Sequence, residues 1–159
     1  MVLETANVKP TNRIVYNSQN IQIQTKKVET ATTVYPGRLV KKGTNDDDVI
    51  VGTEALGNIG WAGYEQTCKL HRPATVDTIY LADAQIAVLS GPGIKLVASI
   101  KSGAVGVKGI MLKGAAAGQL DVAGATDAAV AVAEETVTGA TGGPGTALGG
   151  SDIMVRSLI

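Results

Sequence analysis

The sequence predicts an all-β protein, built as a small β-barrel or sandwich with an extended N-terminal arm. Its apolar runs are too short for ordinary helices, and Gly, Pro or Ser bounds each of them. The pattern is clearest in residues 79–113, with runs at Ile86–Leu89, Ile94–Ala98 and Gly109–Leu112. Between the first two runs, Ser90–Gly93 has the composition of a hairpin turn or a tight β-corner. Short strands with glycine at each corner are typical of small barrels and sandwiches.

The remaining strands follow from the same signals. Residues 20–25 alternate apolar and polar side chains with period two, which is the mark of a strand with one apolar face. Residues 73–83 fit a strand or irregular loop better than a helix, and residues 128–135 fit a buried strand better than an alanine-rich helix. The apolar end of the chain predicts that its last strand is tied into the sheet. The other expected strands are Arg38–Lys42, Val49–Val51, Gly118–Gly124, Ala128–Glu135 and Asp152–Ile159.

Residues 1–32 differ in composition from residues 33–159, which form the predicted barrel domain. The first segment is rich in Asn, Gln, Thr and Lys and almost lacks Gly. One interpretation makes it the first strand of the domain with a ragged leader. The other makes it an arm that adds a strand to a neighbouring chain, so that its removal would leave a folded barrel. For the arm, the predicted partner-binding residues are Ile14, Tyr16, Ile21 and Ile23.

Composition argues against several classes of function. Hydrophobic residues make up 45% of the 159 residues but aromatic residues only 3%, with no Phe, so the core is expected to consist of Val, Ile, Leu and Ala. Such a core offers no aromatic-lined pocket for a small molecule. Fourteen basic residues balance fourteen acidic ones. The pI is about 6.6, and we expect no nucleic-acid partner.

Targeting signals and cysteine usage add two expectations. The first ten residues lack the charged and then apolar pattern of a signal peptide, and no window approaches the roughly 20 apolar residues of a membrane helix. We therefore expect no membrane partner. The single Cys68 excludes an intramolecular disulfide and is expected to be buried as a small apolar residue.

No motif indicates catalysis, a cofactor or a metal. Residues 142–151 lack the Lys that a phosphate loop needs before its Ser, and residues 103–109 lack the dinucleotide-binding glycine spacing. Asp46–Asp48 does not follow the calcium-loop pattern and reads as a solvated loop. His71 is the only histidine, so no His-based metal triad can form. Trp61, in a glycine-dense stretch, is expected to pack over one end of the barrel.

From Tyr35 onward, the chain resembles the capsid decoration (cement) proteins of tailed viruses of bacteria and archaea. The likeness covers about two-thirds of the chain and lies in the pattern of short apolar strands and glycine turns rather than in chemical motifs. The longer Gln/Asn-rich leader departs from the family pattern. The stretches that carry the likeness are Tyr35–Lys41, Gln85–Ala98 with Ser102–Leu112, and Ala129–Glu135 leading to Ile153–Arg156.

The resemblance implies a non-enzymatic virion protein that is made in the host cytoplasm and binds the outer surface of an icosahedral capsid. It implies a homotrimer whose N-terminal segments grip the major capsid protein, without a cofactor. Cementing requires only a rigid barrel and contact surfaces, because repeated symmetric contacts multiply modest affinities. The alternatives are another β-rich phage protein, of the tail tube or of head completion, and a small β-barrel adaptor that binds a peptide or sugar ligand.

Overall fold

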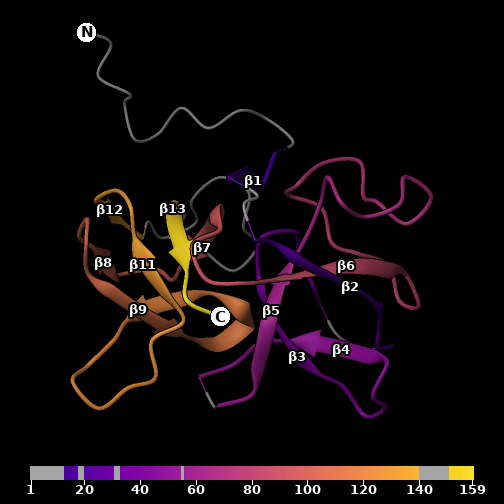
Figure 1. Cartoon of the computed structure of the whole chain (residues 1–159), viewed down its shortest axis with the longest axis horizontal. Helices are drawn as coiled ribbons and strands as arrows, with labels where there is room; N and C mark the ends of the chain where they lie inside the picture. The colour runs from indigo at the N-terminus through magenta and orange to yellow at the C-terminus, as the bar shows by residue number, and fades with distance from the viewer. Residues whose placement is uncertain (1–12, 18–19, 31–32, 55, 140–150) are drawn as a thin grey trace, which may run out of the picture.

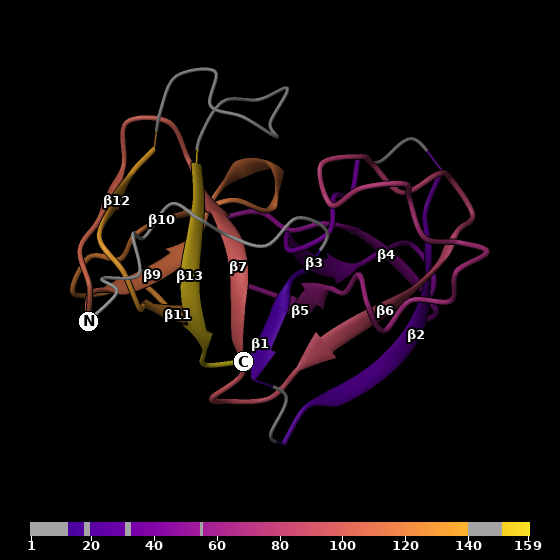
Figure 2. The ribbon, with the colours of Figure 1, turned by 90° about the horizontal axis from the view of Figure 1, so that it is seen from above.

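Two small β-barrels lie side by side in the structure (Figure 1, Figure 2). The structure is a computed structural model, and it describes residues 13–17, 20–30, 33–54, 56–139 and 151–159. Within these ranges the only helix is a single 3₁₀ turn, Ala116–Gly118. The all-β prediction is confirmed, but the expected single barrel is two. The strands have two to seven residues, and such short strands close into small rings.

The first barrel is a closed ring of five strands in the order β2-β4-β3-β5-β6. The pair β2–β4 is parallel, and every other neighbouring pair in the ring is antiparallel. The strands are β2 (Gln22–Val28), β3 (Leu39–Lys42), β4 (Asp48–Val51), β5 (Asn58–Ala62) and β6 (Gln85–Ser90).

The second barrel is formed by β7, β10, β9, β11 and β13, and the β7–β13 pairing closes its sheet. Two smaller elements complete the description: β1 (Val15–Asn17) pairs with β7, and β8 (Val105–Gly106) pairs with β12 (Val137–Thr138). The ring strands are β7 (Lys95–Ile100), β9 (Met111–Gly114), β10 (Leu120–Val122), β11 (Ala131–Ala133) and β13 (Ser151–Ser157).

The two rings have the same topology. If each ring is numbered along the chain, both have the order first, third, second, fourth, fifth, and in both the first and third strands are parallel. The strand registers also correspond, at a separation of about 70 residues. The paired residues Val28–Val49 in the first ring correspond to Ile100–Leu120 in the second. In the same way Val40–Val51 corresponds to Leu112–Val122, and Ala62–Val88 corresponds to Ala133–Val155. The chain is therefore an internal repeat of one barrel.

A glycine turn before the second strand is part of the repeat. Gly37 precedes β3 with φ of 77°, and Gly109 precedes β9 with φ of 87°. This left-handed conformation favours glycine because it has no Cβ. A Cβ on Gly37 would also lie 2.5 Å from the carbonyl oxygen of Val97 in β7, so this turn lets the two barrels approach closely.

A cluster of buried residues joins the barrels. One buried cluster fills the first barrel with Val, Ile, Ala and one Tyr, and a larger one combines the interior of the second barrel with first-barrel residues at the seam. Trp61 belongs to the larger cluster, is fully buried, and donates its indole N–H to Ser157 Oγ in β13 at 3.0 Å. Trp61 was expected to pack over one end of the barrel; it lies in the wall strand β5 and packs into the core at the seam.

The N-terminal segment departs from the predicted arm. Residues Gln22–Lys27 pair with β6 and Val28 is fully buried, so β2 is a wall of the first barrel. In the described part of residues 1–32, the structure thus follows the interpretation of a first strand. An arm boundary at residue 32 would cut off one of the five strands of a closed ring. Residues 1–12 lie outside the described residues.

Three further expectations are resolved by the strand pairings. Ser90–Gly93 is a corner rather than a hairpin, because β6 belongs to the first barrel and β7 to the second. Residues 73–83 form turns and irregular loop without a strand. The chain end is tied in, since Leu158 N–H donates to Val130 O at 2.9 Å and Gly91 N–H donates to Ile159 O at 2.8 Å.

Candidate interaction surfaces

An apolar groove lies on the long loop between β5 and β6. Three of its lining residues are large and apolar, and they are exposed: Leu70 (85%), Leu81 (75%) and Ile79 (37%). The groove has a volume of about 240 Å³ and is also lined by Pro73 and Asp83. Single exposed apolar side chains are common, but several gathered in one concave surface are typical of a contact site for another protein.

The loop that carries the groove is held in place although it contains no regular strand. Tyr80 is 1% exposed, and its hydroxyl donates to Gly63 O and contacts Thr67 Oγ1. The Thr67 hydroxyl in turn donates to Gly63 O at 3.2 Å and accepts the Ala87 N–H of β6 at 3.0 Å. These bonds fix the loop to the wall of the first barrel.

A second set of contacts fixes the turn next to Leu70. The Arg72 guanidinium donates to Glu65 O at 2.8 Å and to Thr67 O at 2.9 Å, and it stacks 5.1 Å from the centre of the Tyr64 ring. The Tyr64 hydroxyl donates to the Pro73 carbonyl at 3.1 Å. An apolar surface that is already ordered loses less conformational entropy on binding, which favours this groove as a contact surface.

The buried Tyr80 makes the loop less stable at high pH. Burial raises the pKa of its hydroxyl to about 12, compared with about 10 in an unfolded chain. Because the folded-state pKa is the higher one, the stabilisation is fully present below pH 10 and is lost as the pH rises towards 12. We expect the free energy of unfolding to fall by about 2–3 kcal/mol more in the natural protein than in Tyr80→Phe between pH 9 and pH 12. Urea denaturation at both pH values measures this, and equal losses in the two proteins would contradict it.

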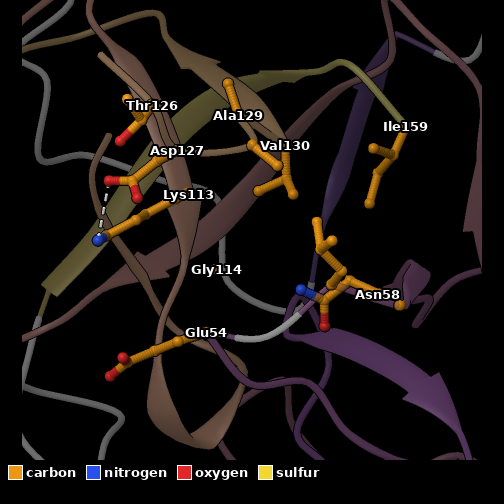
Figure 3. Close-up of a pocket in the computed structure, with 12 residues that line it drawn as sticks. Glu54, Asn58, Lys113, Gly114, Thr126, Asp127, Ala129, Val130 and Ile159 are labelled. Carbon is orange, nitrogen blue, oxygen red and sulfur yellow. Dashed lines mark ion pairs between the residues drawn. The ribbon is translucent and has the colours of Figure 1, made fainter. Parts of the chain in front are cut away.

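A second concave surface lies at the seam between the barrels (Figure 3). This cleft of about 520 Å³ is lined by Glu54, Asn58, Lys113, Asp127 and the apolar Val130, among others. In Figure 3, Lys113 and Asp127 point towards each other, and their ion pair is 3.0 Å long.

In this cleft Lys113 and Asp127 neutralise each other. The Asp127 carboxylate raises the pKa of Lys113, while the Gly124 N–H and then Lys113 lower the pKa of Asp127. At the seam, position 114 is occupied by glycine, and a Cβ there would lie 2.6 Å from Thr53 O. Asn58 Nδ2 donates to the same carbonyl at 3.0 Å. We interpret this cleft as the joint between the repeats, since it lies between the two barrels and its lysine is paired with Asp127.

The structure separates the four predicted arm residues. Ile14 is 3% exposed in the core, and Ile21 is half-buried against the same core. Tyr16 is half-buried under the Arg13 guanidinium, 4.9 Å from its ring centre, and burial raises the pKa of its hydroxyl. Ile23 is 50% exposed on β2. Ile21 and Ile23 thus differ in burial. That these residues bind a partner stays a prediction.

Other candidates from the sequence have structural partners or lie outside the described residues. Asp46 pairs with Lys42 at 2.6 Å, and Asp48 accepts the Asn45 side-chain amide at 2.7 Å. Cys68 is exposed, contrary to the expected burial, because it lies in a turn where His71 N–H binds its carbonyl. The glycine-rich segment 140–150 is not described.

Two features are absent from the described residues. No group of three or more His, Cys, Asp or Glu side chains there is arranged to hold a metal ion. No helix in the described ranges has the length and apolarity needed to cross a membrane.

Comparison with known proteins gives a likeness in fold. The sequence matches no protein-family model, and a search of the curated proteins finds no match either. Among solved structures, the chain is similar to the crystal structure of the head fiber gp8.5 N base of bacteriophage phi29. The TM-score is 0.50 at 14% sequence identity, and the match covers 86% of this chain and 93% of that chain. At this identity the likeness concerns the fold, and it extends over most of both chains.

The sequence did not single out the groove or the seam. Part of the groove, with Ile79 and Leu81, lies in the stretch 73–83 that was expected to be strand or irregular loop, and Leu70 lies just before it. A possible signal was Leu70, which has polar neighbours on both sides and belongs to no predicted strand. An apolar residue without a place in a periodic pattern is a candidate for exposure.

Proposed function

We propose that this protein is a structural component of a tailed-virus particle, which binds the outer surface of the icosahedral capsid as a homotrimer and stabilises it. The observation that carries the proposal is the fold likeness to the base of a phage head fiber, which covers 86% of this chain. The finer role on the capsid follows the expectation from the pattern of short strands and glycine turns in the sequence. The partner we assign is the major capsid protein, and we propose no enzymatic activity.

The groove is the surface that we assign to the capsid contact. Burying an exposed leucine contributes about 1.5–3 kcal/mol. Leu70 and Leu81 together would therefore contribute at least about 3 kcal/mol, which corresponds to roughly a hundredfold in Kd. Since the loop is already fixed by Tyr80, Thr67 and Arg72, little of this is lost to ordering.

Co-sedimentation with virus particles stripped of this protein tests the assignment. We expect the natural protein to sediment with the particles and the Leu70→Ser/Leu81→Ser variant to bind roughly a hundredfold more weakly. The matched control is Leu56→Ser, because Leu56 is 84% exposed but lies at the seam between the barrels. Equal binding by all three proteins would exclude the groove, and no binding by the natural protein would contradict the proposed function.

A further inference from the structure

We propose that the outer edge of β2, at Ile23 and Thr25, is a docking site for a short extended segment of the capsid shell protein. The segment would run antiparallel to β2 and add a strand to the first barrel. This inference rests on the proposed function and names a second contact of the same protein with the shell. It is carried by a difference between the two repeats.

In the second barrel the equivalent edge is filled. β13 pairs along one edge of β7 from Lys95 to Ile100. Two strands share the other edge: β10 pairs at Ile100, and β1 pairs antiparallel near Leu96. The N–H of Val97 donates to Ile14 O at 2.9 Å, and the N–H of Lys101 donates to Leu120 O at 2.9 Å. These two residues thus point their backbone groups to the shared edge.

In the first barrel the same edge of β2 is half empty. β6 pairs with β2 along Gln22–Lys27, whereas β4 joins the opposite edge only at Lys27 and Val28. The Lys27 N–H donates to Asp47 O at 2.8 Å, next to β4, and the Val28 N–H donates to Ala84 O at 2.9 Å, on the side of β6. Backbone groups alternate between the two edges of a strand. The N–H and C=O groups of Ile23 and Thr25 therefore point away from β6, to an edge where no strand of the described chain pairs with them.

Exposure follows the same difference. Leu96, Val97 and Ala98 of β7 are all buried, whereas Gln24, Thr25 and half of the Ile23 side chain are exposed on β2. Figure 2 shows β1 beside β7 between the barrels, while β2 runs along the outer margin of the molecule.

The open edge lacks the usual protection. Proteins normally shield strand edges with charges, prolines or bulges. Residues 22–25 contain no charge and no proline, and their pairing with β6 is free of bulges. Lys26 and Lys27 follow, but they form ion pairs with Asp47 and Asp48. An unshielded edge with an exposed Ile at its centre is suited to strand addition.

The geometry favours a short segment over a second copy of β2. From Lys27 onward β4 occupies the edge, so the incoming strand has room to pair only with residues 22–26. A second β2 in antiparallel register, with Ile23 opposite Thr25, would place its own β4 against Asn20 and Ile21 of the first copy. A free extended segment has no such neighbour. The strand β1, with Val15 opposite Leu96, shows the kind of occupant: short and antiparallel, with an apolar residue paired to the edge.

Amide hydrogen exchange of the full chain, free and bound to stripped virus particles, tests the proposal. In the free protein we expect the amides of Ile23 and Thr25 to exchange rapidly and that of Val28 slowly. On particles, the amides of Ile23 and Thr25 should slow by about a hundredfold or more. Protection in the free protein at every concentration would mean that the chain covers its own edge. Protection that grows with protein concentration would mean that a second copy does so. Either result would overturn the proposal.

A variant pair gives an independent readout by co-sedimentation. Thr25→Pro removes the outward N–H and should weaken particle binding by about tenfold or more, while Gln24→Ala keeps every backbone group and should bind normally. Circular dichroism verifies that both variants are folded. If Thr25→Pro is not folded, the exchange measurement on the natural protein decides whether the edge of β2 binds the shell. Particle binding without protection of Ile23 and Thr25 would overturn this inference alone. No binding by the natural protein would overturn the proposed function as well.

Discussion

Replacing Val28 with Asp should unfold the protein. Val28 is fully buried inside the first barrel, where its neighbours are aliphatic side chains such as Val49 and Ile86. A carboxylate there would have to be buried in a site with no polar partner or stay protonated at neutral pH, and either costs several kcal/mol. We expect a loss of at least about 4 kcal/mol from a total stability that is typically about 5–15 kcal/mol.

The matched control for this variant lies on the same strand. Ile23→Asp places the same side chain on β2, but at a position that is 50% exposed, and the change in stability should stay below about 1 kcal/mol. Urea denaturation followed by circular dichroism measures both. If Val28→Asp were as stable as Ile23→Asp, β2 would not be a wall of the barrel, and residues 1–32 would be the separable arm that their composition indicated.

The second large effect is expected at the seam between the repeats. Trp61→Ala should lower the free energy of unfolding by about 3–5 kcal/mol, because it removes a fully buried side chain from the cluster that spans both barrels. Since that cluster contains residues of both barrels, the variant and the natural protein should each unfold in a single transition. Circular dichroism in urea follows both, as Trp61 is the only tryptophan and fluorescence is lost with it.

The hydrogen bond of Trp61 can be tested separately. Ser157→Ala leaves the buried indole N–H without its acceptor and should cost about 1–3 kcal/mol. In the Trp61→Phe background the same Ser157→Ala change should cost much less, because the donor is then absent. Equal costs in both backgrounds, or two separate unfolding transitions, would contradict the description of the seam.

The predictable part of this fold is local. Short apolar runs and turn glycines placed β6, β7 and β13 within one or two residues of their observed bounds, because strand and turn preferences act over a few positions. The partners of the strands could not be predicted in this way. The corner at Ser90–Gly93 has the same composition whether it closes a hairpin or passes from one barrel to the next, and only packing of the two cores decides between them.

The repeat left a faint trace in the sequence. Pro36-Gly37-Arg38-Leu39-Val40-Lys41 and Lys108-Gly109-Ile110-Met111-Leu112-Lys113 share the turn glycine, the apolar pair and the final lysine. Each stretch forms the turn before the second strand of its ring. A comparison of the chain with itself would have had to detect one shared glycine, one shared lysine and an apolar pair between them. The exposed groove and the open edge of β2 depend on what covers each residue in three dimensions, which no periodicity records.

Electron cryo-microscopy of the virus particle that contains this protein tests the central proposal most directly. We expect density for pairs of adjoining five-stranded barrels on the outer surface of the icosahedral shell, grouped in threes, with the loop around Leu70 and Leu81 against the shell. Density for this fold in the tail, inside the shell or nowhere in the particle would contradict it.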